Sequence, residues 1–311
     1  MEVLALVDRL GLIFGLIAIG FLLVKVKVVS GKDTKVLADI VILVATPALM
    51  FTSIIGSCDV GPIADYSIMF VAGVFMPLLL VVIAYFAARI MKLGRPKLGV
   101  FLCANAFPNT VFIGLPVTVA LYGNETVASV AVLDFAVTLV FWTIGLALLT
   151  DNFKWPRLGS LLNAVLNAPF VVLIISLLLA LAEVKPPSLL LDMGEMIGQI
   201  AIPLSLLLIG MTMATFTRTS MEFDKSIGAT LFLRHIVSPL IMLLVVYSLP
   251  IPILSKQVLV LQAGLPTMMG VSIVVQAYGK EHGYATCLVV ASTIASLVTI
   301  PLVAYTLGIL L

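Results

Sequence analysis

Residues 97–122 of the chain read KLGVFLCANAFPNTVFIGLPVTVALY, an apolar run with a proline, an asparagine and a threonine near its centre. A helix that spans a membrane needs about 20 mostly apolar residues, and this run is long enough. Pro108 removes a main-chain donor in mid-run and clashes with the preceding helical turn. Asn109 and Thr110 follow it, and such side chains cap the N-terminus of a new helix. The stretch therefore predicts a membrane helix that is interrupted at Pro108.

The whole chain has the same apolar character. Of its 311 residues, 62% are hydrophobic and 10% are charged, and the mean hydropathy is +1.27. An ordinary globular chain is roughly 45–50% apolar and about 25% charged. We therefore predict an all-α polytopic membrane protein and not a soluble enzyme. The balance of 17 Lys and Arg against 15 Asp and Glu leaves no basic face for a nucleic acid.

Motifs that carry enzyme chemistry are missing from the sequence. It contains no phosphate-binding loop, dinucleotide fingerprint or nucleophile motif, so we expect no catalytic residues and no cofactor. The cysteines at positions 58, 103 and 287 have no metal or disulfide spacing. His235 and His282 likewise lack a ligand partner at metal spacing, and we expect no metal site.

Ten apolar runs could cross a membrane. They lie near 4–24, 36–55, 66–90, 97–122, 127–149, 161–182, 193–215, 226–249, 256–278 and 285–310. Lys and Arg collect after the odd-numbered runs, and an excess of these residues marks the cytoplasmic side. The pattern predicts a multi-pass protein of the cell membrane, surrounded by lipid, with both termini outside.

The two halves of the chain match without gaps at an offset of 156 positions. The offset relates Pro47 to Pro203, Pro96 to Pro252, Gly114 to Gly270, Tyr122 to Tyr278, Gly123 to Gly279 and Glu125 to Glu281. Each half holds five runs, an odd number, so the second half enters the membrane from the opposite side. We therefore predict two inverted repeats, residues 1–155 and 156–311, an arrangement typical of secondary transporters.

The ninth run has its own proline near mid-span. It reads Gln262-Ala263-Gly264-Leu265-Pro266-Thr267. Non-helical backbone at membrane depth is tolerated only where protein or a water-filled cavity satisfies it, and two matching breaks point to a binding site. The alternative is that these prolines only kink continuous helices. Half-helix N-termini attract anions, so the pattern favours a substrate with a carboxylate.

Other polar residues lie inside apolar runs. The predicted substrate-binding residues are Asn105, Pro108, Asn109, Thr110, Gln262, Pro266 and Thr267. An intramembrane charge is a functional hypothesis by default, so Asp134 could bind a proton or a sodium ion. Arg234 could neutralise the substrate, pair with Asp134 or extend to the interface, and Gln276 could line the pathway. Asp39 and Glu195 are expected in the first turns of their helices, where an acid complements the helix dipole.

The motifs in the fourth run resemble those of the auxin efflux carrier family, which includes plant PIN-type carriers and many prokaryotic transporters. They are Pro108-Asn109-Thr110, Gly114-x-Pro116 and Tyr122-Gly123, and similar second-half patterns are Leu265-Pro266 and Ile300-Pro301-Leu302. The resemblance covers essentially the whole chain. The long cytoplasmic loop of the plant carriers is absent, as in the short prokaryotic members.

This resemblance implies a sodium/bile-acid symporter-like fold, in which helices four and nine are broken and cross. It also implies a scaffold of helices one, two, six and seven beside a mobile transport domain of helices three to five and eight to ten. Elevator-type movement of that domain would carry an organic anion such as indole-3-acetate or malonate. By the same analogy Asn109 touches the substrate, and the scaffold helices form a homodimer contact.

The sequence therefore predicts a secondary transporter of a small organic anion. A sodium/proton antiporter is the first alternative, because crossed broken helices also serve that chemistry, although antiporters usually place two or more carboxylates at the crossing. A membrane sensor on a transporter scaffold is the second alternative. Coupling to protons or to sodium stays open at this point.

Overall fold

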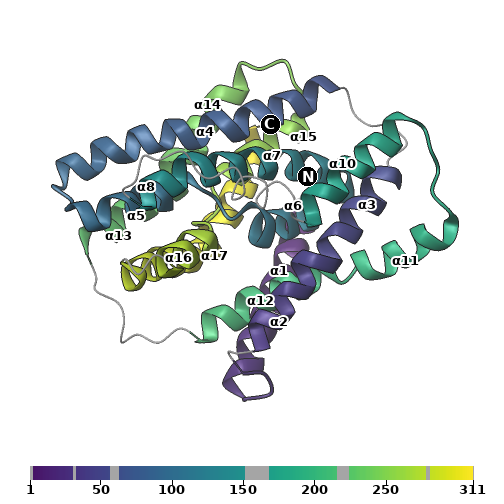
Figure 1. The fold of residues 1–311 in the computed structure, drawn as a ribbon, viewed down its shortest axis with the longest axis horizontal. Helices are drawn as coiled ribbons and strands as arrows, with labels where there is room; N and C mark the ends of the chain where they lie inside the picture. The colour runs from purple at the N-terminus through teal and green to yellow at the C-terminus, as the bar shows by residue number, and fades with distance from the viewer. Residues whose placement is uncertain are drawn as a thin grey trace. The chain divides into compact units, whose positions relative to one another are not determined.

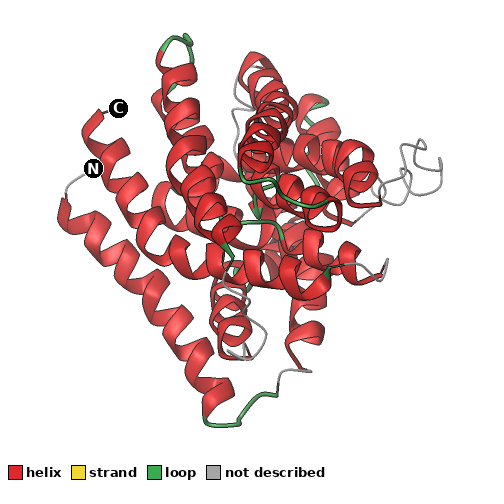
Figure 2. Ribbon diagram, turned by 90° about the vertical axis from the view of Figure 1, so that its left-hand side faces the viewer, coloured by secondary structure: helices red, strands yellow, loops and turns green. Residues whose placement is uncertain are grey.

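The structure is a computed structural model that describes residues 3–30, 33–56, 63–150, 168–215, 224–277 and 281–310. All the named elements within these ranges are helical, and none is a strand (Figure 2). Six helical segments among them are long and apolar enough to cross a membrane. The prediction of an all-helical polytopic membrane protein is confirmed at this level.

The chain divides into two compact units. Unit 1 comprises Met1–Ile68, Val111–Val132 and Val165–Phe216, and unit 2 comprises Met69–Thr110, Leu133–Ala164 and Thr217–Leu311. The first unit holds α1 (Val3–Lys25), α2 (Asp33–Ile40), η1 (Val41–Ala45), α3 (Thr46–Gly56), α6 (Leu115–Tyr122), η3 (Asn124–Thr126), α10 (Ala168–Leu181), α11 (Ser188–Gly198) and α12 (Ala201–Thr215).

The second unit contains both proline interruptions. It holds most of α4 (Ile63–Ile90), then α5 (Arg95–Ala106), the second half of α7 (Val127–Val140), η4 (Phe141–Gly145), α8 (Leu146–Thr150), α13 (Lys225–Phe232), η6 (Leu233–Val237), α14 (Ser238–Tyr247), α15 (Ile253–Ala263), α16 (Met269–Ala277) and α17 (His282–Leu310). The π-helical turn η2 (Thr110–Gly114) begins in this unit at Thr110, and its other residues belong to unit 1.

Within unit 1, α1 and α12 lie side by side (Figure 1). Their backbones approach closely at two glycines, because a Cβ atom at Gly20 would clash with the main chain of Leu207, and one at Gly210 with that of Ile17. Small residues at helix contacts are the usual means of close packing inside a membrane. The two glycines therefore let the backbones of α1 and α12 pack in direct contact.

Within unit 2, helices pack closely around the interrupted segments. Gly73 of α4 lies against Leu133 and Ala136 of α7, and Gly99 of α5 lies against the main chain of Leu148 in α8. Helix α17 contacts α5, α13 and α15. The interrupted segments are thus surrounded by protein and are not exposed to lipid.

Four π-helical turns occur in the described part of the chain, namely η1, η2, η4 and η6. Such turns are rare and concentrate at functional sites, because they re-aim side chains within a helix. Here η2 begins at Thr110 and η6 carries Arg234 and His235. Two of the four therefore present polar residues predicted from the sequence.

Two helix starts differ from the prediction. Helix α2 begins at Asp33, so Asp39 is near its end, and α11 begins at Ser188, so Glu195 is near its C-terminus. The predicted placement of both acids in a first turn is wrong. The reason is that Asp33 accepts hydrogen bonds from Ser30 and starts α2 earlier than the apolar run suggests.

Some predictions fall outside the described residues. They are the repeat boundary at 155/156, the first residues of the run at 161–182, the repeat partners Tyr278 and Gly279, and both chain termini.

Candidate functional site

The two interrupted helices meet in unit 2. Helix α5 ends at Ala106, Phe107 is extended, and η2 begins at Thr110, whereas the second interruption separates α15 from α16. The N–H of Asn109 donates to the Pro266 carbonyl at 2.9 Å, and the N–H of Met268 donates to the Phe107 carbonyl at 2.9 Å. We call these two segments, 107–109 and 264–268, the crossing. Each segment satisfies main-chain groups of the other that lipid could not satisfy.

Arg234 binds the carbonyl ends of both helices that lead into the crossing. This side chain is 0% exposed. Its Nε and Nη2 donate to the Leu265 carbonyl at 3.0 and 2.5 Å, and its Nη1 donates to the Asn105 carbonyl at 2.9 Å. The guanidinium charge therefore compensates the negative ends of α5 and α15.

This geometry decides between the alternatives that the sequence left for Arg234. Among the described residues Arg234 forms no ion pair with Asp134, so the predicted pairing is wrong in this conformation. Extension of the side chain to the interface is also wrong, because the guanidinium is buried at the crossing.

A second set of polar side chains supports the same carbonyls. Ser238 donates to the Ala263 carbonyl at 2.8 Å. The His235 Nδ1 lies 3.1 Å from the Gly264 carbonyl and 3.0 Å from the hydroxyl of Thr299. These contacts agree with a structural role for His235. Sequence reasoning missed Ser238, although a serine one helical turn after His235 in an apolar run was an available signal.

Thr267 connects the second interrupted segment to α5 and to α17. Its hydroxyl donates to the Ala104 carbonyl at 2.8 Å, and its N–H donates to Ser292 Oγ at 3.1 Å. Ser292 was also missed from the sequence, because its partner is far away along the chain.

Two asparagines at the crossing carry buried polar atoms without a partner. Asn105 donates to the Phe101 carbonyl at 2.7 Å and to Thr230 Oγ1 at 3.2 Å, but its Oδ1 accepts no hydrogen bond within the described ranges. Asn109 is 3% exposed, and its Nδ2 donor has no acceptor there. A buried group without a partner is costly, so a ligand or water is expected to supply one.

Asp134, in the middle of α7, has its carboxyl group next to Thr110, the first residue of the helix that leaves the crossing. Thr110 Oγ1 donates a hydrogen bond to Asp134 Oδ1. The carboxyl group is half-buried, and Thr110 is its single hydrogen-bond partner among the residues that the structure describes. A negative charge here complements the positive end of the helix that begins at Thr110.

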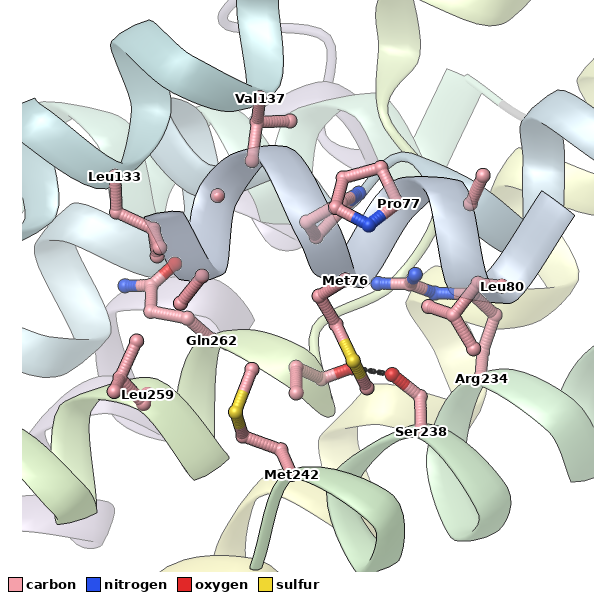
Figure 3. Close-up of a pocket in the computed structure, with 15 residues that line it drawn as sticks. Met76, Pro77, Leu80, Leu133, Val137, Arg234, Ser238, Met242, Leu259 and Gln262 are labelled. Atoms are coloured by element: carbon pink, nitrogen blue, oxygen red, sulfur yellow. Dashed lines mark hydrogen bonds between the residues drawn. The ribbon is translucent and has the colours of Figure 1, made fainter. Parts of the chain in front are cut away.

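A small pocket of about 20 Å³, partly open to the exterior, lies beside the crossing. Its walls are mainly apolar and come from α4, α7, α14 and α15. The polar atoms belong to Gln262 on one side and to Arg234 and Ser238 on the other (Figure 3). This volume holds about one water molecule, so an organic ligand would have to widen the pocket.

The structure brings together most of the predicted site residues. Those at the crossing or in direct contact with it are Asn105, Pro108, Asn109, Thr110, Asp134, Arg234, Pro266 and Thr267, and Gln262 is in the last turn of α15. Gln276 is elsewhere: it is exposed in the last turn of α16, about 10 Å along that helix from its start. No group of three or more potential metal-binding side chains occurs in the searched part of the chain.

These features define the class to which the protein belongs. The described part of the chain is all-helical, and several of its apolar helices are long enough to cross a membrane. Its two broken helices satisfy each other's main-chain hydrogen bonds inside one unit. Such a chain is a multi-pass membrane protein.

The chain belongs to the auxin efflux carrier family, whose sequence profile, described as membrane transport protein, matches residues 7–154 and 158–304. This is a family of membrane transporters and not of enzymes. An uncharacterised transporter of Methanothermobacter thermautotrophicus is 29% identical over 288 residues, which cover 92% of this chain and 93% of the relative. An uncharacterised transporter of Methanocaldococcus jannaschii is 24% identical over 305 residues, covering 92% and 94%.

Proposed function

We propose that this protein is a secondary transporter that carries a small organic anion across the cell membrane, with the anion bound at the crossing. The observation that carries the proposal is the Nδ2 donor of Asn109, which is buried and lacks an acceptor among the described residues. Asn109 directly precedes the helix that begins at Thr110. A carboxylate oxygen would satisfy the amide donor and interact favourably with the helix N-terminus.

The charge distribution at the crossing supports an anion and not a cation. Arg234 and Ser238 donate to carbonyls at the ends of α5 and α15, so the negative helix ends already have donors. The helix that leaves the crossing from Met269 keeps its positive end, and the helix that begins at Thr110 keeps its own when Asp134 is protonated. The net field where Asn109 lies therefore favours negative charge.

The apolar walls of the pocket beside Pro108 suit the body of such a substrate, for which the pocket would have to widen from about 20 Å³. Met76, Leu133 and Leu259 contribute apolar wall, which fits an amphipathic anion better than an inorganic ion. Arg234 has five N–H donors, and three of them donate to carbonyls. The remaining donors are available to an acceptor in this pocket.

The element order supports the two-repeat arrangement. The sequence α13, η6, α14, α15 and α16 in the second half corresponds at the offset of 156 to α4, α5, η2 and α6 in the first. Both interruptions fall at matching places, so we propose that the crossing lies at the interface of two inverted repeats.

The two compact units support transport by domain movement. Unit 1 contains α1, α3, α10 and α12, and unit 2 contains the crossing. We propose that unit 2, together with the helix that begins at Thr110, carries the substrate past the other helices of unit 1 in an elevator movement, and that scaffold helices of unit 1 pair two copies of the chain. Residues 111–132 group with unit 1, whereas the predicted transport domain included all of helix four.

Sodium/proton antiport is disfavoured by the composition of the crossing. Asp134, which is hydrogen-bonded to Thr110 directly after the crossing, is the single carboxylate with a contact there in the described part of the chain. The other polar side chains that contact it are amides, hydroxyls, Arg234 and His235. An organic anion is therefore the better match.

Flux measurements in proteoliposomes test the proposal. We expect saturable uptake of malonate or indole-3-acetate by the wild type. Asn109→Ala removes the donor, and Asn109→Asp replaces it with a negative acceptor of the same shape, so both should abolish uptake. Gln199→Ala, which truncates an exposed amide, is the matched control and should keep it. Uptake by both Asn109 variants at the wild-type rate would refute the assigned site. Sodium/proton exchange without anion flux in the wild type would favour the antiporter.

A further inference from the structure

The hydroxyl of Thr110 has one hydrogen to donate, and the structure gives it to Asp134. The same hydroxyl belongs to the first residue of the helix at whose N-terminus the proposed anion binds, and Asn109, whose Nδ2 has no acceptor among the described residues, directly precedes it in the chain. An anion that uses this end of the helix must therefore take the place of the Asp134 carboxylate or bind next to it. Two negative charges at such a distance repel each other strongly in a partly buried site.

A proton on Asp134 removes this conflict. The neutral carboxyl group no longer competes for the helix N-terminus, and its O–H becomes an additional donor toward an oxygen of the anion. The proton comes from solution and sits on the Asp134 carboxyl while the anion is bound. It returns to solution on the other side, when the anion leaves and Thr110 again donates to the carboxylate.

Among the residues that the structure describes, no basic group pairs with Asp134 and would hold its carboxylate charged. From α4, Phe70 lies against Phe135, and Gly73 lies against Leu133 and Ala136, so the contact is apolar. The titratable side chains of α4 that the structure describes are Tyr66, Tyr85 and Arg89, of which Tyr85 and Arg89 contact each other beyond Gly73.

The crossing itself contributes two basic side chains, and both are engaged with carbonyls. Arg234 donates to the carbonyls of Leu265 and Asn105, and His235 contacts the Gly264 carbonyl. Neither forms an ion pair with Asp134 among the described residues. Loss of the proton therefore leaves a carboxylate without a cationic partner.

A sodium ion is a poorer fit to the same place. Hard cations need several oxygen ligands at once. The carbonyls of Ala104, Asn105, Phe107, Ala263, Gly264, Leu265 and Pro266 all accept or contact polar groups of the protein already. Among the described residues, the side chains of Asp134 and Thr110 and the open Oδ1 of Asn105 still supply fewer oxygen atoms than such a cation needs.

We propose that Asp134 and the transported anion compete for Thr110 and the helix N-terminus behind it, so that each anion is carried together with one proton on Asp134. This inference rests on the proposed function, because it needs an anion at the crossing.

Calorimetric binding by the full chain in lipid nanodiscs tests the proposal without any variant. Malonate and indole-3-acetate serve as probes at about pH 6.5, 7.5 and 8.5, where both are mainly ionised. We expect the affinity to fall about tenfold per pH unit wherever the unliganded carrier has lost the proton. Titrations in two buffers of different ionisation enthalpy should then show uptake of one proton per anion at the highest pH.

Asp134→Asn mimics the protonated acid and can still accept the hydrogen bond of Thr110. We expect this variant to bind the probe with the wild-type affinity of the lowest pH, with no dependence on pH and no proton uptake. Asp192→Asn changes an exposed carboxylate of α11 and should keep the wild-type slope.

The outcomes separate this inference from the proposed function. Wild-type binding with constant affinity and no proton uptake would overturn the coupling while leaving the anion site intact. Loss of binding in Asp134→Asn, at unchanged thermal stability, would also overturn it, because the charged form would then be required. If neither probe binds to the wild type at any pH, the proposed function fails and the coupling fails with it.

Discussion

The guanidinium of Arg234 donates two hydrogen bonds to one carbonyl oxygen, that of Leu265, from Nε at 3.0 Å and from Nη2 at 2.5 Å. The third bond, from Nη1 to the Asn105 carbonyl, reaches the other interrupted helix. One side chain thus joins the carbonyl ends of both helices that enter the crossing. The buried guanidinium charge therefore stabilises main-chain carbonyls at the interruptions and does not pair with a carboxylate among the described residues.

Arg234→Lys should destabilise the protein, because a single ammonium cannot reproduce the fork that binds both carbonyls. We expect a loss of about 2–4 kcal/mol, as for other buried charged groups whose partners are left unpaired. Thermal unfolding in detergent measures the loss. Arg89→Lys, at an exposed position of α4, is the control and should change stability by less than about 0.5 kcal/mol. Equal melting temperatures for the two variants would contradict this role of Arg234.

Thr267→Val tests the link between the second interruption and α5. The substitution keeps the shape of the side chain but leaves the Ala104 carbonyl without its hydroxyl donor, which should cost about 1–3 kcal/mol. Thr306→Val is the matched control, because the exposed Thr306 hydroxyl donates only to Leu302 in its own helix. The same unfolding assay should separate the two variants. A larger effect at position 306 would show that the crossing does not depend on this bond.

Gly210→Ala should loosen the contact of α1 with α12. The added Cβ would meet the main chain of Ile17, which cannot move without shifting the helix, so we expect a loss of about 1–3 kcal/mol. Gly15→Ala in α1 is the control, because a Cβ there meets nothing within 4 Å. Its greater helix propensity should leave stability unchanged or raise it by up to about 1 kcal/mol. Comparable losses in both variants would argue against a backbone contact at Gly210.

The ion pair between Asp224 and Lys97 leads us to expect that the stability of the protein depends on pH. Partial burial raises the pKa of Asp224, but the N–H of Ser226 and the Lys97 ammonium, 3.3 Å away, outweigh that effect and hold this pKa below its usual value. Because the pKa of Asp224 is lower in the folded than in the unfolded protein, its charged form stabilises the fold. This contribution to the free energy of unfolding is complete above about pH 4, the unfolded pKa, and is lost as the pH falls through the folded pKa.

Asp224→Asn should therefore reduce the acid sensitivity of unfolding. Asparagine can still cap α13, so the variant removes the ion pair and its titration while keeping the cap. We expect the difference in melting temperature between wild type and variant to shrink from about pH 6 to about pH 3. A constant difference over that range would mean that Asp224 does not titrate differently on unfolding.

Much of the fold was predictable because its signals are local. The length of the apolar runs, and the removal of a donor by Pro108 and Pro266, act within a few residues and do not depend on the rest of the chain. The helices end at Ala106 and Ala263, directly before these segments. Helix starts were less predictable, as Asp39 and Glu195 show, because apolar periodicity does not reveal where a cap such as Asp33 forms.

The partners of the polar residues were decided by the tertiary structure alone. Arg234 binds carbonyls 31 and 129 positions away, and Thr110 binds Asp134 across 24 positions. Main-chain carbonyls are present at every residue, so nothing in their sequence distinguishes the ones that Arg234 selects. The amino-acid sequence by itself indicated where two apolar helices are interrupted. Only the packing of unit 2 decided which polar groups fill those breaks and which donor, at Asn109, stays open, because hydrogen-bond partners depend on distance in space and not along the chain.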